Sequence, residues 1–140
     1  MRFEPHGKGT PIQNNLDFRG MQRTAHWIIR IGLSATFLYA GVDMILHPDI
    51  WLGYFPVWAI AKSPVSGSVF VKLDGVVQIV LALGLLWRST IRWSAALIGL
   101  MLFGILVFTG PMDVTFRDIG LLAMALALVV YPGVESHDEE

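Results

Sequence analysis

Apolar residues along this chain gather into four long runs that shorter polar stretches separate. The runs cover about residues 27–46, 69–87, 93–109 and 114–131. An α-helix rises about 1.5 Å per residue, so runs of this length approach or reach the thickness of a bilayer's hydrocarbon core, about 30 Å. The pattern therefore predicts four membrane-spanning helices. Short connections favour antiparallel neighbours, and the expected fold class is an all-α integral membrane four-helix bundle.

The polar residues outside these runs divide the chain and orient it. Residues 1–26 form a polar N-terminal segment, residues 27–132 a single four-helix domain, and residues 133–140 an acidic C-terminal tail. Four spans put both ends on one side, which collects seven of the ten lysines and arginines: Arg2, Lys8, Arg19, Arg23, Arg30, Arg88 and Arg92. Cytoplasmic loops carry an excess of Lys and Arg, so both termini are expected in the cytoplasm. Arg30, near the start of its run, is expected to snorkel toward that side.

The composition agrees with a membrane protein and excludes several other classes. Hydrophobic residues make up 54% of the chain and charged residues 15%, whereas about a quarter of the residues in soluble domains are charged. The net charge is −1 and the cations are scattered, so a nucleic-acid partner is not expected. The absence of cysteine excludes thiol redox chemistry, iron–sulfur clusters and covalently attached haem. The four histidines lie far apart without metal-ligand spacing, so no metal site is predicted.

The fourth run contains two charged residues, Arg117 and Asp118. Residues 119–131 alone would reach only about 20 Å as a helix, so the span has to include residues 114–116 as well. Arg117 and Asp118 then lie about one turn below the membrane surface, where a charge is costly unless it finds a partner or water. We therefore expect polar groups from the other spans to meet them.

The first two spans supply such groups at the same, non-cytoplasmic end. Asp43 lies near the end of the first span, and Lys72 and Asp74 near the start of the second, with Gln78 one turn deeper. Asp74 and Gln78 are four residues apart and share a helix face, whereas Lys72 points to the opposite side. The predicted polar cluster is Asp43, Lys72, Asp74, Gln78, Arg117 and Asp118.

Two interpretations of this cluster remain open. In the structural one, Arg117 pairs with Asp74 or Asp43 and the cluster only holds the helices in register, which is a common role for polar contacts between membrane helices. In the functional one, the cluster is the polar head of an apolar pocket that suits an amphipathic molecule such as a quinone. No nucleophile and base are found together, so no catalytic residues are assigned to this chain.

The connection between the first two spans is rich in aromatic residues, including Trp51, Tyr54 and Trp58. Aromatic rings with one polar edge favour the headgroup layer, which predicts a short interfacial helix broken at Pro56. The connection is either an anchor or a lid over a bound molecule.

Small residues indicate where the helices approach one another. Gly32, Thr36 and Ala40 recur every four residues in the first span, and Ala95 and Gly99 do so in the third. Such spacing favours close packing between membrane helices.

Three stretches resemble the DoxX family of small four-span membrane proteins. They are RIGLSATFLYAGVDMILHPDIW at residues 30–51, GVVQIVLALGLLWRSTIRWSAAL at 75–97 and FRDIGLLAMALAL at 116–128, and the likeness extends over about residues 28–131. The resemblance implies a four-helix bundle in a prokaryotic plasma membrane. Some members are the membrane subunit of a thiosulfate:quinone oxidoreductase, and others belong to membrane-associated oxidoreductase complexes.

The resemblance thus implies a membrane subunit or anchor of a redox complex, with quinone as the candidate ligand. Candidate partners are other membrane subunits or a second copy of the chain, besides the lipid bilayer. Arg117 and Asp118 match the family pattern and are carried over as candidate binding residues. Met44 stands where the pattern has Lys, and Gln78 where it has Glu. Neither Met nor Gln titrates, which weakens the case for a proton-handling role at these positions. If the Lys and Glu of relatives are partners, their joint replacement keeps the buried charge balanced. The alternative is a non-catalytic scaffold protein.

Overall fold

The computed structural model describes residues 11–109 and 113–131. These residues form the helices α1 (Pro11–Leu46), α2 (Pro48–Trp51), η1 (Leu52–Tyr54), α3 (Val57–Ala61), α4 (Gly67–Leu86), α5 (Ile91–Thr109) and α6 (Asp113–Val130). No strand occurs in these two ranges, so the prediction of an all-α chain is confirmed. The bounds of α4, α5 and α6 lie within two residues of the predicted spans. The acidic tail and residues 1–10 lie outside the described residues.

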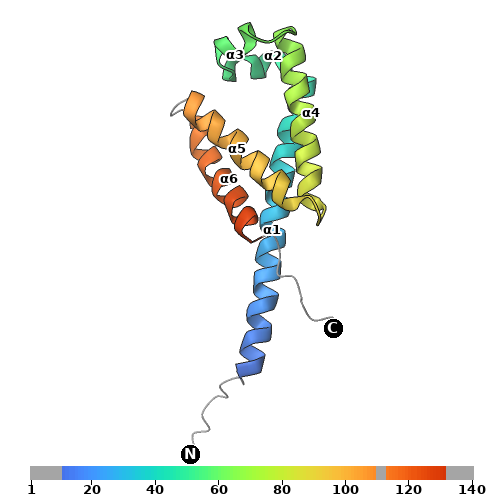
Figure 1. The fold of residues 1–140 in the computed structure, drawn as a ribbon, viewed down its shortest axis with the longest axis vertical. Coiled ribbons are helices and arrows are strands. Elements are labelled where there is room, and N and C mark those ends of the chain that lie inside the picture. The colour runs from blue at the N-terminus through green and yellow to red at the C-terminus, as the bar shows by residue number, and fades with distance from the viewer. Residues whose placement is uncertain (1–10, 110–112, 132–140) are drawn as a thin grey trace, which may run out of the picture.

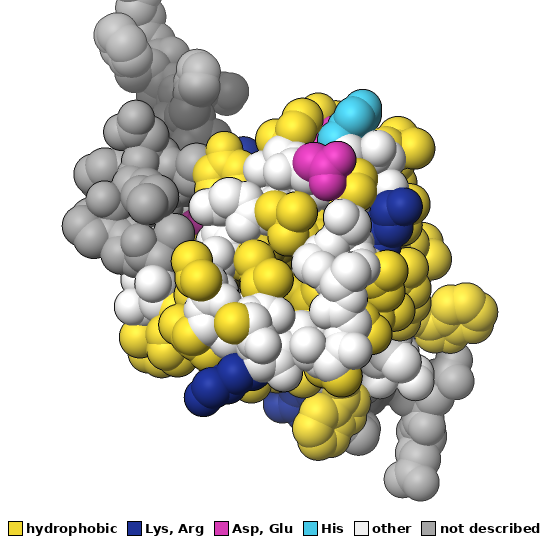
Figure 2. Space-filling model, turned by 90° about the horizontal axis from the view of Figure 1, so that it is seen from above, with side chains coloured by type: hydrophobic (Ala, Val, Ile, Leu, Met, Phe, Trp, Pro, Cys, Tyr) yellow, Lys and Arg dark blue, Asp and Glu magenta, His cyan; other side chains and the backbone are white. Residues whose placement is uncertain are grey.

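Three helices of the described chain are long and apolar enough to cross a membrane. They are α1 from Gly20 to Leu46, α4, and α5 from Ile91 to Phe108. The helix α6 is not among them, and its 18 residues include the charged Asp113, Arg117 and Asp118. The outer surface is largely apolar, with Leu100 as much as 68% exposed. Apolar side chains also gather on the face in Figure 2. An extensive apolar surface is typical of contact with lipid and indicates a membrane protein.

The four long helices run alternately up and down and pack side by side (Figure 1). The closest pairs are α1 with α4 and α5 with α6, and contacts of α4 with α5 and of α1 with α6 complete the arrangement. The connecting segment, residues 47–66, joins α1 to α4 at one end and contains α2, η1 and α3. The core between the helices includes Leu33, Leu85, Ile98 and Leu128, each at most 1% exposed.

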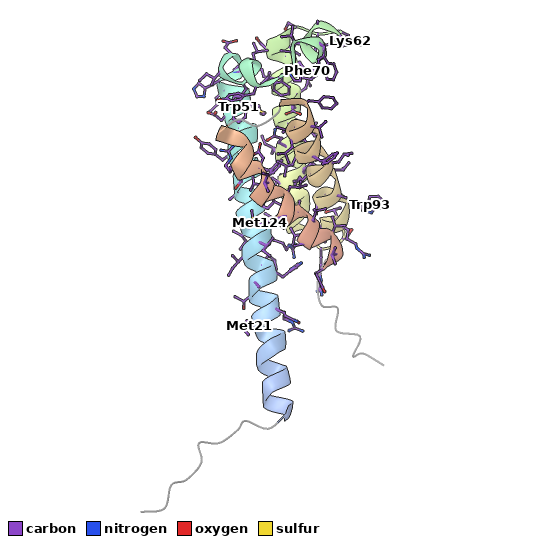
Figure 3. The ribbon with its side chains drawn as sticks, turned by 90° about the vertical axis from the view of Figure 1, so that its left-hand side faces the viewer. Met21, Trp51, Lys62, Phe70, Trp93 and Met124 are labelled. Atoms are coloured by element: carbon purple, nitrogen blue, oxygen red, sulfur yellow. The ribbon has the colours of Figure 1, made fainter. Side chains whose placement is uncertain are left out.

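The helix α1 begins at Pro11 instead of near residue 27. Its N-terminal part protrudes beyond the other helices, and Met21 lies on this overhang (Figures 1 and 3). Hydropathy marks only the apolar part of a helix, whereas backbone hydrogen bonds can extend the same helix through polar sequence. The predicted polar segment is therefore helical from Pro11 onward.

The closest approach of α1 to α4 occurs at two glycines. A Cβ atom added to Gly41 would lie 2.6 Å from the carbonyl oxygen of Gly75, and one added to Gly75 would lie 2.7 Å from that of Gly41. The predicted contact at Gly32 is wrong, because a Cβ atom there would meet nothing within 4 Å. The buried face of α1 carries Leu33, Phe37, Gly41 and Met44. These residues are shifted by one position along the sequence from the predicted stripe of Gly32, Thr36 and Ala40. The predicted contact at Gly99 is confirmed against Ala125 of α6.

Arg30 fastens α1 to the end of α4. Its side chain does not snorkel but is buried, with 4% of the residue exposed. The guanidinium donates hydrogen bonds from Nε to the carbonyl oxygen of Leu85 (2.9 Å) and from an Nη atom to that of Leu86 (2.8 Å). The last carbonyl groups of a helix have no partner within the helix, so these oxygens are free to accept from another helix. Ser34 adds a 2.8 Å hydrogen bond to the carbonyl oxygen of Ala82.

Candidate functional site

A cavity of about 500 Å³ lies at the end of the molecule that carries the connecting segment. Figure 3 shows this end, with Trp51, Lys62 and Phe70 labelled on it. The wall of the cavity includes residues of α1, the connecting segment, α4, α5 and α6. Its polar and charged side chains are Thr36, Asp43, Asp74, Gln78, Arg117 and Asp118, apart from the aromatic Trp51, Tyr54 and Trp58. Lys72 is exposed and does not line the cavity, so five of the six residues of the predicted cluster meet there.

Asp74 and Gln78 form the α4 side of the polar wall. Their spacing of four residues places them on one helix face, and Gln78 Nε2 donates a hydrogen bond to Asp74 Oδ2 at 3.1 Å. The same Nε2 atom lies 3.3 Å from the sulfur of Met44 on α1. Gln78 is buried, with 3% of its surface exposed. Met44 and Gln78 are therefore direct neighbours in space although they belong to different helices.

Asp43 connects the end of α1 to the connecting segment. Trp51 Nε1 donates a 2.8 Å hydrogen bond to Asp43 Oδ2, and His47 Nδ1 lies 3.0 Å from Asp43 Oδ1. Both carboxylate oxygens of Asp43 are thus occupied. The indole ring of Trp51 also packs against Tyr54, with 5.7 Å between ring centroids.

Arg117 and Asp118 line the cavity from α6 but differ in exposure. The Arg117 side chain is 63% exposed, and that of Asp118 is 8% exposed. Arg117 Nε lies 3.7 Å from Asp118 Oδ1. The ion pairs of Arg117 with Asp74 or Asp43, which the structural interpretation of the cluster offered, are not found among the described residues. The exposed position of its side chain places the guanidinium at the rim of the cavity.

The rest of the wall is apolar and aromatic. The three aromatic residues of the predicted lid, Trp51, Tyr54 and Trp58, all line the cavity. The connecting segment is broken at Pro56 as expected, with η1 before it and α3 after it. Trp58 packs against Phe108 of α5 at 5.4 Å between ring centroids, so the segment spans the cavity from α1 to α5.

No pattern in the sequence indicated that α5 takes part in this site. Met101, Leu102 and Phe108 line the cavity, but they belong to an uncharged run in which no residue stands out. Which of its apolar faces turns inward depends on packing against the other helices. A local pattern could not have selected these residues.

The chemistry of the wall suits binding more than catalysis. It combines carboxylates, an amide and a guanidinium, which can donate and accept hydrogen bonds from a polar head group, with an apolar remainder that suits a lipophilic body. In the part of the chain that the structure describes, no three His, Asp or Glu residues are placed to hold a metal ion. No protein-family model, curated protein or solved structure matches this chain.

Proposed function

We propose that this chain is an integral membrane protein that binds an amphipathic lipophilic molecule in the cavity and acts as a membrane subunit or anchor of a quinone-linked redox complex of the DoxX type. In this proposal all four long helices span a prokaryotic plasma membrane, and both termini lie in the cytoplasm. Quinone, which has a hydrogen-bonding ring and an apolar tail, is the candidate ligand. The chain supplies the binding site, and partner subunits supply the remaining redox chemistry.

One observation carries the proposal: among the described residues, the charged groups of α1, α4 and α6 line a cavity instead of forming ion pairs between the helices. Among the described residues, Asp74 is bonded by Gln78 of its own helix, and Asp118 lies nearest to its neighbour Arg117. Asp43 is bonded by Trp51 and His47, which follow it in the chain. A cluster that served to hold helices together would need strong hydrogen bonds between them. The bond described between helices here, from Gln78 Nε2 to the sulfur of Met44, is to a weak acceptor.

The alternative, a scaffold protein without a ligand, is less well supported. The hydrogen bonds from Arg30 and Ser34 to backbone oxygens of α4 join α1 to α4, and neither of these residues lines the cavity. The glycine contact of Gly41 with Gly75 adds close packing between the same two helices. The helices therefore have other means of keeping their register, which leaves the residues of the cavity available for binding.

Mass spectrometry of the purified protein tests the proposal. The full chain is extracted from its native membrane in mild detergent and analysed for co-purifying quinone and partner subunits. In Arg117→Ala the rim of the cavity loses its strongest hydrogen-bond donor, so we expect quinone retention to fall about tenfold, the effect of losing one charge-assisted hydrogen bond.

Lys72→Ala is the matched control. It removes a cation near the same end of the molecule, from a residue that does not line the cavity, and should leave retention unchanged. Equal retention in all three proteins, or no lipophilic ligand in any of them, would contradict the proposal.

A further inference from the structure

Hydrogen-bond donors on three sides of the cavity wall are already occupied within the protein. On α1 the hydroxyl of Thr36 donates to a backbone oxygen of its own helix at 2.9 Å. On the connecting segment Trp51 Nε1 donates to Asp43 at 2.8 Å. On α4 the amide nitrogen of Gln78 donates to Asp74 at 3.1 Å. A ligand in the cavity finds these donors already paired.

The other side chains of the wall that can donate are exposed. They are Arg117, Tyr54 and Trp58, of which Arg117 comes from α6 and the other two from the connecting segment. The side chain of Arg117 is 63% exposed, and Tyr54 and Trp58 are exposed as well. Donors are therefore available to a ligand at the exposed rim of the cavity.

The side-chain oxygen of Gln78 is a buried acceptor that faces the cavity without a donor. Gln78 lines the cavity and has only 3% of its surface exposed. Its contacts with Asp74 and with the sulfur of Met44 both use Nε2, and no donor bonds Oε1 among the described residues. Oε1 is also not one of the described polar atoms that protein atoms enclose without a partner. The oxygen is therefore open to the cavity, and a ligand that covers it without donating to it leaves it unsatisfied.

The two redox forms of a quinone differ in what they offer to such an acceptor. Both ring oxygens of a quinone are carbonyl oxygens, which accept hydrogen bonds and cannot donate them. In the reduced form, the quinol, each oxygen carries a hydrogen and can do both, as a tyrosine hydroxyl does. Both forms are neutral, have the same apolar tail and can accept from Arg117 at the rim. The Gln78 oxygen is thus the group that distinguishes between them.

We propose that the cavity binds the quinol form more tightly than the quinone form, with one quinol hydroxyl donating to Gln78 Oε1. The quinone form would cover the same oxygen with a carbonyl group and leave both acceptors without a hydrogen. Gln78 is then the residue that sets the specificity of the site for the redox form. This preference rests on the proposed function in one respect, because the cavity has to hold a quinone-type ring.

Three probes with the same ring and tail test the preference on the unmodified full chain. They are decylubiquinol, decylubiquinone and the dimethyl ether of decylubiquinol, which keeps the reduced ring but has no hydroxyl hydrogen. Binding is measured anaerobically by isothermal titration calorimetry in mild detergent, with protein-free micelles as the blank. We expect decylubiquinol to bind about tenfold more tightly than decylubiquinone, the effect of one hydrogen bond to a buried acceptor. Equal affinities of these two probes, or tighter binding of the quinone, would overturn the preference.

The dimethyl ether separates the hydroxyl hydrogen from the shape of the reduced ring. It should bind no more tightly than decylubiquinone, because it cannot donate to Gln78 Oε1. If the ether bound as tightly as decylubiquinol, hydrogen bonding to this oxygen would not be the cause of the preference, and the assignment to Gln78 would be refuted.

A double variant locates the preference on α4. Gln78→Met removes the acceptor at similar side-chain length, and Asp74→Asn in the same chain prevents the released carboxylate from accepting in its place. An asparagine amide donates as well as accepts, so the two redox forms should bind this variant within about twofold of each other. Gln22→Met with Asp49→Asn makes the same two changes at exposed residues outside the cavity and should keep the tenfold preference. A preference that persists in the α4 double variant would refute the role of Gln78; if that variant does not fold, the three probes on the unmodified chain still decide.

The same titrations separate this preference from the proposed function. If decylubiquinone and decylubiquinol bind equally, the cavity holds a quinone-type ring as proposed, and selection of the reduced form fails. If neither of them binds, both the proposed function and the preference fail.

Discussion

Replacing Arg30 by methionine tests the contact that fastens α1 to α4. Methionine retains most of the apolar stem and removes the guanidinium, so the packing changes little while the hydrogen bonds are lost. The change leaves the carbonyl oxygens of Leu85 and Leu86 without their donors. It also removes the guanidinium that lies 4.3 Å from the centre of the Trp27 ring.

The expected loss of stability follows from these contacts. Polar contacts between membrane helices contribute about 0.6–2 kcal/mol each, and a cation over an aromatic ring about 0.5–1 kcal/mol. Two hydrogen bonds and one such stacking contact sum to about 2–5 kcal/mol. Arg30→Lys retains the charge but replaces the planar fork of donors by a single ammonium, so its loss should be smaller.

Reversible unfolding in mixed detergent micelles, followed by circular dichroism of the helices, measures these differences. Arg23→Met is the matched control, because Arg23 is an exposed arginine on the same helix. We expect the free energy of unfolding to fall in the order wild type and Arg23→Met, then Arg30→Lys, then Arg30→Met. If Arg30→Met lost no more stability than Arg23→Met, the two hydrogen bonds would not be holding the helices together, and the reasoning would be refuted.

Two further changes probe the helix contact and the connecting segment. Gly75→Ala should destabilise the protein by about 1–3 kcal/mol, because the new methyl group meets the backbone oxygen of Gly41. Gly32→Ala places its methyl group in open space and should not destabilise the protein. Equal unfolding midpoints of the two variants would contradict this account. Trp51→Phe keeps an aromatic ring but removes the donor to Asp43, so amide hydrogen exchange in residues 48–61 should become faster; unchanged exchange would show that the bond does not hold the segment in place.

Hydropathy predicted most of the helices, because a helix that crosses a membrane must be apolar and about as long as the hydrocarbon core is thick. The bounds of α4, α5 and α6 follow from the apolar runs, and the break in the connecting segment follows from Pro56, which cannot donate a backbone hydrogen bond. Hydropathy did not predict the overhang of α1, because a helix outside the membrane needs no apolar run. The meeting of Asp74 and Gln78 was predictable from their spacing on one helix.

Contacts between distant parts of the chain were not predictable in the same way. Arg30 and Leu85 are 55 positions apart, and nothing near Arg30 in the sequence distinguishes a snorkelling arginine from one that binds another helix. The contact between Gly41 and Gly75 depends on the rotation of both helices about their axes. The ion pair of Arg117 with Asp74 or Asp43 is not found for the same reason. The position of a residue along a span indicates its depth in the membrane but not the direction in which its side chain points.

The continuity of α1 has a structural consequence. The helix is 36 residues long and spans about 54 Å without interruption, from the overhang to the wall of the cavity. The overhang and Asp43, near the other end of the helix, therefore belong to one uninterrupted element. Asp43 accepts a hydrogen bond from Trp51, so the same helix that carries the overhang also holds an aromatic residue of the cavity wall in place.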